Sequence, residues 1–194
     1  MGITGIILAG GKSSRMGSDK GLILFNGKPM VSYSIELMKE FCDRIIISTS
    51  NPEYAQFGYE LIPDIYPDKG PLGGLYTCLK ESNSEINLCL PCDVPLMFRG
   101  ILQKLTDESD SQSCIVPLTP LPEPLIAVYP SAVIPVLEQM LNEGTYKMAS
   151  IYDCFPTKYI NLDQFPEGTN IKQFRNMNSM SDFTNFGIPT DNNA

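Results

Sequence analysis

The sequence predicts an α/β fold with a mainly parallel central sheet, and three observations support this prediction. Apolar runs without alternating polar residues recur along the chain, as expected of strands that are buried on both faces. Segments with apolar residues at helical spacing stand between these runs, which indicates amphipathic helices. The alternation of the two patterns over 194 residues is typical of one α/β domain of moderate size.

The first half of the chain is expected to supply four strands and two helices. The helix over 30–42 begins after Pro29, which suits the start of a helix because proline has no amide hydrogen to leave unpaired. The second helix follows a loop over 64–74. The predicted strands of this half are 3–9, 44–50, 59–63 and 86–91.

The second half continues the alternation with shorter elements. It contains predicted helices over 98–106, 131–143 and 147–154, predicted strands over 114–118, 124–129 and 158–162, and a short terminal helix near 179–183. In open α/β sheets, ligands bind beyond the carboxyl ends of the strands. The loops after the first, third and fourth strands are therefore the candidate site, and they span 9–21, 64–74 and 92–97.

Composition excludes several classes of function. Histidine is absent, which removes the Ser-His-Asp and Cys-His mechanisms and imidazole acid–base catalysis. The net charge of −8 argues against general nucleic-acid binding, which needs a basic surface. The first 30 residues nevertheless hold four cations and a single acid, namely Lys12, Arg15, Lys20, Lys28 and Asp19. Such a cluster in an acidic protein indicates either a small anionic ligand or a solvated basic face.

The cysteines favour a reducing compartment. Most of the six lie in apolar runs, and the pair Cys89 and Cys92 has no second pair to complete a zinc site. We therefore expect buried structural thiols. No apolar run approaches the length of a membrane span, and no targeting segment is visible at the N-terminus. The sequence thus predicts a cytoplasmic protein that does not enter a membrane.

The loop after the first strand has the features of a phosphate-binding turn. Gly10 and Gly11 let the backbone approach a ligand closely, and successive amides in such a turn form an anion-binding concavity. Arg15 adds a planar fork for phosphate oxygens, and Lys20 adds a compact point charge. The loop is neither a Walker A motif nor a GxGxxG motif. The alternative is a glycine-rich turn with solvated cations.

Two acidic residues end other strands. Asp93 stands between two prolines after the fourth strand and is placed to bind Mg²⁺, which prefers one or two carboxylates together with phosphate oxygens and water. A helix cap or an Asx-turn is the alternative for this residue. Asp64 ends the third strand, before Gly70, Gly73 and Gly74. These close glycines could admit a base or ribose, or could simply turn the chain.

A family resemblance joins these motifs. The first loop, LAGGKSSRMGSDKG, resembles the LAGGxSxRMGxDK signature of nucleotidyltransferases that activate small phosphorylated molecules. The order and spacing of the later motifs are similar to the molybdenum cofactor guanylyltransferase (MobA) family over nearly the whole chain. These motifs are NGKP at 26–29, IPD at 62–64, GPLGG at 70–74, PCDVP at 91–95, PEPLIAVYP at 122–130 and NMNS at 176–179.

The resemblance implies a Rossmann-like three-layer α/β/α fold in a single domain over 1–194, with a nucleotide-binding half over about 1–97 and an acceptor-substrate half over about 98–194. It implies that Arg15, Lys20 and Asp93 are catalytic and that Asp93 holds Mg²⁺. The nucleotide-binding residues that it implies are Leu8, Ala9, Gly10, Gly11, Lys20, Ser48, Asp64 and Asp93, and the acceptor residues are Asn176 and Asn178. Well-matched members usually have Asn where this chain has Ser48, a shorter donor.

The resemblance also implies a reaction. GMP would pass from GTP to molybdopterin in the form of the molybdenum cofactor, and pyrophosphate would leave, with molybdoenzymes that receive the cofactor as candidate partners. Sibling cytidylyltransferases commonly have LAAG where this chain has LAGG, which favours GTP over CTP. Two alternatives stay open: a cytidylyl- or sugar-phosphate nucleotidyltransferase on the same scaffold, and a non-catalytic nucleotide-binding regulator.

Overall fold

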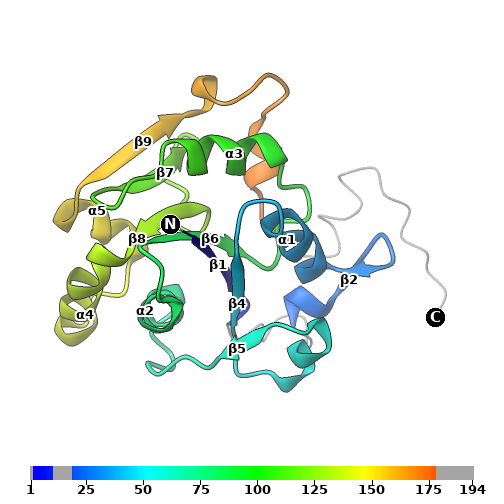
Figure 1. Ribbon diagram of the computed structural model, residues 1–194, viewed down its shortest axis with the longest axis horizontal. Coiled ribbons are helices and arrows are strands. Elements are labelled where there is room, and N and C mark those ends of the chain that lie inside the picture. The colour runs from blue at the N-terminus through cyan, green and yellow to red at the C-terminus, as the bar shows by residue number, and fades with distance from the viewer. Residues whose placement is uncertain (1, 11–18, 178–194) are drawn as a thin grey trace.

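The computed structural model describes residues 2–10 and 19–177, and its core is a seven-stranded sheet (Figure 1). The strand order is β5-β4-β1-β6-β8-β7-β9, and only β8 runs antiparallel to its neighbours. The predicted mainly parallel sheet is therefore confirmed. The strands are β1 (Ile3–Leu8), β4 (Arg44–Ser48), β5 (Glu60–Ile62), β6 (Ile86–Pro91), β7 (Cys114–Leu118), β8 (Ala127–Pro130) and β9 (Thr157–Asn161).

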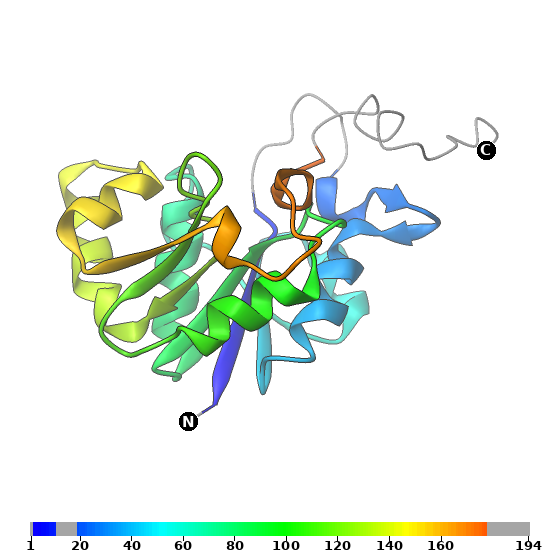
Figure 2. The same cartoon turned by 90° about the horizontal axis from the view of Figure 1, so that it is seen from above.

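Helices cover both faces of the sheet, as Figures 1 and 2 show. On one face, α1 (Met30–Met38) and α3 (Arg99–Asp107) pack on Ile7, Ile47 and other strand residues. On the other face, α2 (Pro71–Ser82), α4 (Ile134–Glu143) and α5 (Ile151–Cys154) form a second core. Burial of the strands between two apolar layers explains their continuous apolar runs. The three-layer arrangement is thus confirmed.

Short elements complete the described chain. A small hairpin pairs β2 (Leu24–Phe25) with β3 (Lys28–Pro29). The 3₁₀-helices are η1 (Lys20–Leu22), η2 (Pro52–Phe57), η3 (Ser131–Val133), η4 (Met148–Ser150), η5 (Leu162–Gln164) and η6 (Ile171–Phe174). The sequence pattern predicted neither the hairpin nor η2, because elements this short leave no periodic signal. The helix expected near 179–183 lies outside the described residues.

Some predicted boundaries were wrong, for local reasons. The helix expected over 30–42 ends at Met38, because Asp43 returns the chain to β1 through two hydrogen bonds with the Ile3 backbone, each 2.9–3.0 Å long. The loop expected to reach residue 74 ends at Gly70, since Pro71 begins α2. The strand expected over 124–129 begins only at Ala127, after a turn and two prolines that cannot donate hydrogen bonds.

The strand ends that carry the candidate loops meet at one edge of the sheet. Backbone hydrogen bonds continue past the strands there: Ala9 N donates to Ser48 O at 3.0 Å, Thr49 N to Ile62 O at 3.0 Å, and Cys92 N to Leu8 O at 3.1 Å. The residues that directly follow β1, β4 and β6 are therefore tied to the neighbouring strands by backbone hydrogen bonds. Among the described residues, no helix combines the length and the apolar character needed to cross a membrane.

Candidate functional site

Two adjacent pockets open at the carboxyl edge of the parallel strands. The smaller has a volume of about 220 Å³ and the larger about 680 Å³. Both are lined by Leu8, Ala9, Gly10 and Asp19, so the end of β1 and the residues after it separate them. This is the position at which α/β sheets bind ligands.

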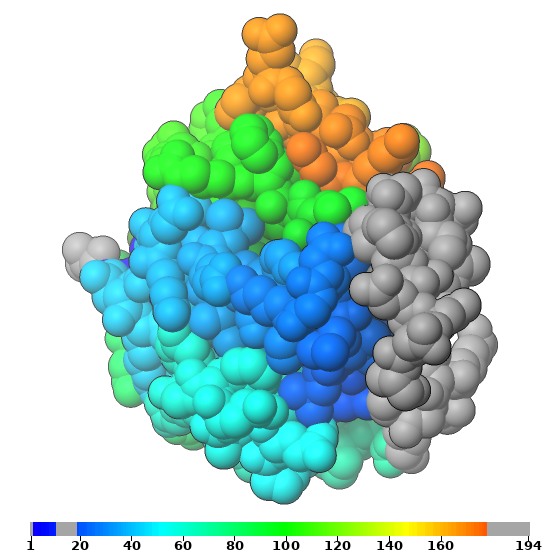
Figure 3. Space-filling model, turned by 90° about the vertical axis from the view of Figure 1, so that its right-hand side faces the viewer, coloured from blue at the N-terminus to red at the C-terminus, as the bar shows by residue number. Residues whose placement is uncertain are grey.

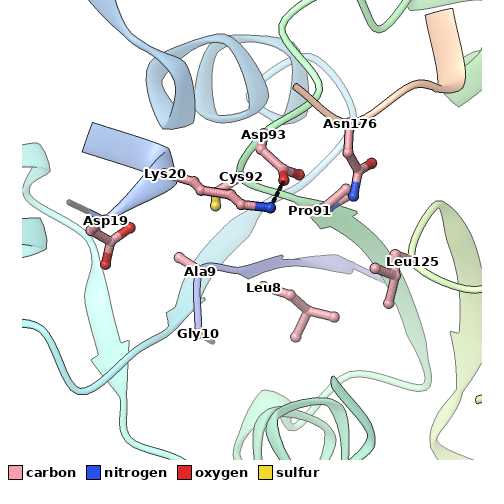
Figure 4. A pocket seen from close by; sticks show the side chains of 10 residues that line it. All are labelled: Leu8, Ala9, Gly10, Asp19, Lys20, Pro91, Cys92, Asp93, Leu125 and Asn176. Atoms are coloured by element: carbon pink, nitrogen blue, oxygen red, sulfur yellow. Dashed lines mark ion pairs between the residues drawn. The ribbon is translucent and has the colours of Figure 1, made fainter. Parts of the chain in front are cut away.

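The smaller pocket contains an ion pair. Lys20 Nζ lies 3.6 Å from Asp93 Oδ2, with 31% of the lysine side chain exposed and 8% of the aspartate side chain (Figure 4). Lys20 enters from η1, and Asp93 follows β6. Leu125, just before β8, and Asn176, from the segment after η6, also line this pocket. Residues far apart in the chain thus meet around one cation and one carboxylate.

Asp93 is a buried acid in a fixed position. Its carbonyl accepts a hydrogen bond from Met177 N at 2.9 Å, which ties the C-terminal segment to the loop after β6. In the preceding residues, Ser34 Oγ of α1 donates to Pro91 O at 2.9 Å. Burial raises the pKa of Asp93, and the charge of Lys20 lowers it. Because burial is the larger influence, the carboxylate is only partly compensated by its lysine partner.

The larger pocket has few charged groups and many small ones. It lies between the ends of β4 and β5 and the first turn of α2, and its remaining lining residues are Ser48, Thr49, Ser50, Asn51, Asp64, Pro67, Asp68, Gly70, Pro71 and Gly74. A β-carbon at Gly74 would lie 2.6 Å from Ser48 Oγ. The absence of a side chain at Gly74 therefore lets α2 approach β4 closely and leaves the Ser48 hydroxyl in place.

Asp64 both lines the larger pocket and closes a turn. Its Oδ1 accepts a hydrogen bond from Tyr66 N at 2.7 Å and one from Thr77 Oγ1 at 3.4 Å. A β-carbon at Gly73 would lie 2.7 Å from Asp64 Oδ2, so this glycine is required by the close approach of the carboxylate. Burial raises the pKa of Asp64, and the two donors lower it. Asp64 therefore closes a local turn and lines the larger pocket at the same time.

Gly10 stands where the two pockets meet. The nearest atom to a β-carbon built there is Ser48 O at 3.8 Å, which is ordinary contact distance. Within the part of the chain that the structure describes, neither backbone strain nor protein packing requires glycine at this position, because its φ lies outside the left-handed region and a β-carbon would meet no atom closer than Ser48 O. The missing side chain instead leaves room on the side of the pockets.

Most of the residues predicted for the site meet at this edge. Leu8, Ala9, Gly10, Lys20, Ser48, Asp64, Asp93 and Asn176 each line at least one of the two pockets. Gly11, Arg15 and Asn178 lie outside the described residues. The sequence analysis missed Asp19, Asn51 and Leu125 as lining residues. The position of Asp19 directly before Lys20 was an available signal, whereas nothing in the pattern around Asn51 pointed to the site.

The donor set can be tested against Mg²⁺. The described residues contain no group of three or more His, Cys, Asp or Glu side chains that could enclose a metal, so they provide no all-protein cage. A single buried carboxylate with a raised pKa, at Asp93, fits the mode in which Mg²⁺ takes one or two protein carboxylates and completes its shell with phosphate oxygens and water. The residues present therefore fit a metal that arrives with a phosphorylated ligand.

Comparison with known proteins identifies the scaffold. Residues 5–157 match the family described as "MobA-like NTP transferase domain". A "Probable molybdenum cofactor guanylyltransferase" of Flavobacterium johnsoniae is 35% identical over 183 residues, which covers 92% of this chain and 96% of the relative. A "Molybdenum cofactor guanylyltransferase" of Vibrio atlanticus is 30% identical over 187 residues and 94% of each chain.

A solved structure has the same fold. Molybdopterin-guanine dinucleotide biosynthesis protein A from Archaeoglobus fulgidus superimposes with a TM-score of 0.79 over 94% of this chain and 95% of that one. At 20% sequence identity this likeness concerns the fold alone.

Proposed function

The chain belongs to the MobA-like NTP transferase family and is a nucleotidyltransferase, and we propose that it transfers GMP from GTP to the molybdenum cofactor. Relatives that carry the name molybdenum cofactor guanylyltransferase match it along more than nine-tenths of its length. The single observation that carries the proposal from family to chemistry is the Lys20–Asp93 pair, which lies in the smaller pocket beside the larger one. The product is a guanine dinucleotide form of the cofactor.

The proposed step is a displacement at phosphorus. A terminal phosphate oxygen of molybdopterin forms a bond to the α-phosphorus of GTP. The bond from that phosphorus to the oxygen that bridges to the β-phosphate breaks, and pyrophosphate leaves. The attacking phosphate monoester has a second pKa near 6, so it is largely ionised at neutral pH and needs no general base. A chain without histidine can therefore catalyse the step by positioning and charge neutralisation.

Each pocket has a distinct task in this proposal. The larger pocket binds the guanosine, because its volume of about 680 Å³ and its hydroxyl, amide and glycine lining suit a purine nucleoside. The smaller pocket holds the phosphates, where Lys20 donates to their oxygens. Asn176 and Leu125 lie on the side of the smaller pocket from which the acceptor would approach. Arg15 is proposed to act on the phosphates from the first loop.

Enzymes of the nucleotidyltransferase family typically use Mg²⁺, and Asp93 is the residue that would hold it here. When bound, the metal would neutralise charge that develops on the α-phosphate and on the leaving pyrophosphate. Asp93 itself supplies a buried carboxylate at a fixed strand end, and the charge of Lys20 opposes the rise in its pKa that burial causes. The cytoplasmic location stays a prediction, in accord with six free cysteines.

One experiment separates this proposal from its alternatives. Purified protein is incubated with molybdenum cofactor, Mg²⁺ and each of GTP, CTP, ATP and UTP, and the products are identified by mass. We expect the guanine dinucleotide and pyrophosphate with GTP. Turnover with CTP that equals or exceeds turnover with GTP would reassign the chain to the cytidylyl branch. Nucleotide binding without pyrophosphate release from any acceptor would indicate the regulator.

A further inference from the structure

The residue before Lys20 is tied into the protein by three hydrogen bonds. Asp19 Oδ1 accepts from Tyr54 Oη at 2.5 Å and from Gly21 N at 3.2 Å, and Asp19 Oδ2 accepts from Asn51 Nδ2 at 3.3 Å. Asp19 is thereby the N-cap of η1, the short helix that begins with Lys20. In Figure 4 Asp19 lies apart from the Lys20–Asp93 pair, beyond the start of the Lys20 side chain. Holding Asp19 therefore fixes where the Lys20 side chain starts.

Tyr54 packs beside the sequence neighbours of both members of the ion pair, namely Gly21 and Cys92. It is completely buried, and its hydroxyl lies against Gly21, where a β-carbon would collide with it. The same β-carbon would lie 3.1 Å from Cys92 Cβ, so Gly21, Tyr54 and Cys92 are packed together. Cys92 directly precedes Asp93. One buried phenol thus lies at the junction between the segment of Lys20 and the segment of Asp93.

The segment that carries Tyr54 is itself well anchored. Tyr54 belongs to η2, whose N-cap Asn51 accepts a hydrogen bond from Glu53 N at 3.0 Å. In Figure 3 the segment around η2, drawn in cyan, lies against the segment that follows Lys20, drawn in blue. Burial raises the pKa of Tyr54, so the phenol is protonated at neutral pH and can donate its hydrogen bond to Asp19.

We propose that Tyr54 is a positioning residue for the transfer reaction: its hydroxyl, acting through Asp19, fixes Lys20 opposite Asp93. The inference rests on the proposed function of Lys20. Tyr54 is not among the residues that line either pocket, and it has no exposed surface. An effect of its hydroxyl on turnover must therefore pass through other residues, and the hydrogen-bond path leads to Lys20.

The test begins with Tyr54→Phe, which keeps the buried ring and removes only the donor to Asp19. We expect kcat to fall roughly ten- to a hundredfold, because displacing a positioned group by about 1 Å has an effect of that order, while KM for GTP changes much less. Tyr76→Phe is the matched control, since Tyr76 is also buried and donates to a carboxylate, Glu138 Oε1, at 2.8 Å, but lies on α2 outside both pocket linings. It should retain wild-type turnover.

A double-mutant comparison separates positioning from general stability. In a Lys20→Ala background, Tyr54→Phe should lower kcat by less than twofold, because the group that it positions is already gone. If the loss from Tyr54→Phe is the same with and without Lys20, the hydroxyl does not act through Lys20 and the inference is wrong.

A second readout is independent of catalysis. Amine acetylation of the nucleotide-free protein, followed by mass spectrometry, reports the reactivity of Lys20 relative to exposed Lys172. Tyr54→Phe should raise the labelling of Lys20 severalfold, because a lysine that leaves Asp93 is less shielded, and Tyr76→Phe should leave it unchanged. Unaltered labelling in Tyr54→Phe overturns the inference even if turnover falls. If wild-type protein makes no dinucleotide while Lys20 labelling rises as expected, the proposed function fails and the positioning contact stands.

Discussion

The smaller pocket is organised around a cation and a carboxylate 3.6 Å apart, whereas the larger pocket is organised around glycines, hydroxyls and backbone at the start of α2. The two share the end of β1 and the residues that follow it. The residues that line only the smaller pocket come from four separate segments of the chain, which contain Lys20, Asp93, Leu125 and Asn176. Those of the larger pocket all come from residues 48–74.

The difference indicates how the reaction is divided. Charge neutralisation stabilises a transition state most where water is excluded and the charged groups are already held in place. The buried Asp93 meets both conditions. Recognition of a base needs shape and a few donors and acceptors, which the larger pocket supplies. Variants of the smaller pocket should therefore act mainly on turnover, and variants of the larger pocket mainly on the choice of nucleotide.

The largest effect is expected from Asp93→Asn, which keeps the shape and removes the charge. The carboxylate is needed most as charge develops in the transition state, so kcat should fall by about 10²–10³-fold, while the Kd for GTP changes far less. Raising Mg²⁺ or supplying Mn²⁺ should recover part of the rate, because mass action refills a weakened site. Steady-state kinetics and nucleotide titration on the same preparation measure both quantities.

Thermal stability distinguishes this result from a structural role. Burial raises the pKa of Asp93, so the stability that this group contributes is present at low pH and is lost as pH rises through its pKa in the folded protein. Above that pKa, ionisation of the buried group opposes folding. The metal-free Asp93→Asn protein should consequently have a Tm at neutral pH that is equal to or above that of the wild type. A lower Tm with full specific activity and no metal rescue would falsify the catalytic role.

Lys20→Ala should have the next largest effect. Loss of a charge-assisted hydrogen bond costs roughly 1.5–3 kcal/mol, which corresponds to about ten- to a hundredfold in affinity or rate. Since Lys20 lowers the pKa of Asp93, the acidic limb of the rate profile should also move to higher pH. The measurement is kcat and KM for GTP across pH, with Lys20→Arg as the control that keeps the charge. Unfolding of Lys20→Ala with normal nucleotide affinity in the folded fraction would show a structural lysine.

A smaller effect should follow Gly10→Ala, which converts LAGG at 8–11 into LAAG, the sequence that is common in cytidylyltransferases. Among the described residues the β-carbon has space, so Tm should hardly change, while the added methyl group takes up room at a position that lines both pockets. Turnover with GTP should fall roughly tenfold relative to turnover with CTP, the usual size of discrimination by one methyl group in a pocket. Competition between the two nucleotides measures the ratio. An unchanged ratio would show that Gly10 does not select the base.

The sequence alone was sufficient to predict the features of the two pockets that follow from local residue patterns. Continuous apolar runs identified the buried strands, and the carboxyl-end rule placed Asp93 and Lys20 at one edge before any contact was known. The same rule placed Asp64 there, whereas Ser48, the last residue of β4, was expected at the site only from the family resemblance. Lys20, Asp64 and Asp93 share the property that each lies in a loop after a strand whose burial is visible in its own residues.

The rest depended on contacts between distant segments. Tyr54 belongs to a short 3₁₀-helix without periodicity, and Asn51 is the N-cap of that helix. Their hydrogen bonds to Asp19 span 35 and 32 residues of sequence. Leu125 reaches the smaller pocket only because β8 runs antiparallel, which brings the start of that strand to the same edge. No pattern within one segment contains this information. The roles assigned to the site residues stay predictions, and Gly11, Arg15 and Asn178 lie outside the described residues.

The smallest effect is expected from the cysteine pair that neighbours the site. Cys89 belongs to the core under α2 and α4, whereas Cys92 belongs to the core under α1 and α3, so the two thiols lie on opposite faces of the sheet and cannot form a disulfide without rearrangement. Burial raises the pKa of both thiols, which keeps them in the unreactive protonated form at neutral pH.

Native alkylation tests this difference directly, because Cys154 is exposed while Cys89 and Cys92 are buried. Iodoacetamide should modify Cys154 first, and mass spectrometry of the peptides should find the other two unmodified until the protein unfolds. Mild oxidant should leave turnover unchanged, and Cys89→Ala should lower Tm through the cavity that it creates while the folded fraction keeps its specific activity. Stoichiometric zinc in the purified protein, or turnover that follows the redox state, would instead show that this pair takes part in the chemistry of the smaller pocket.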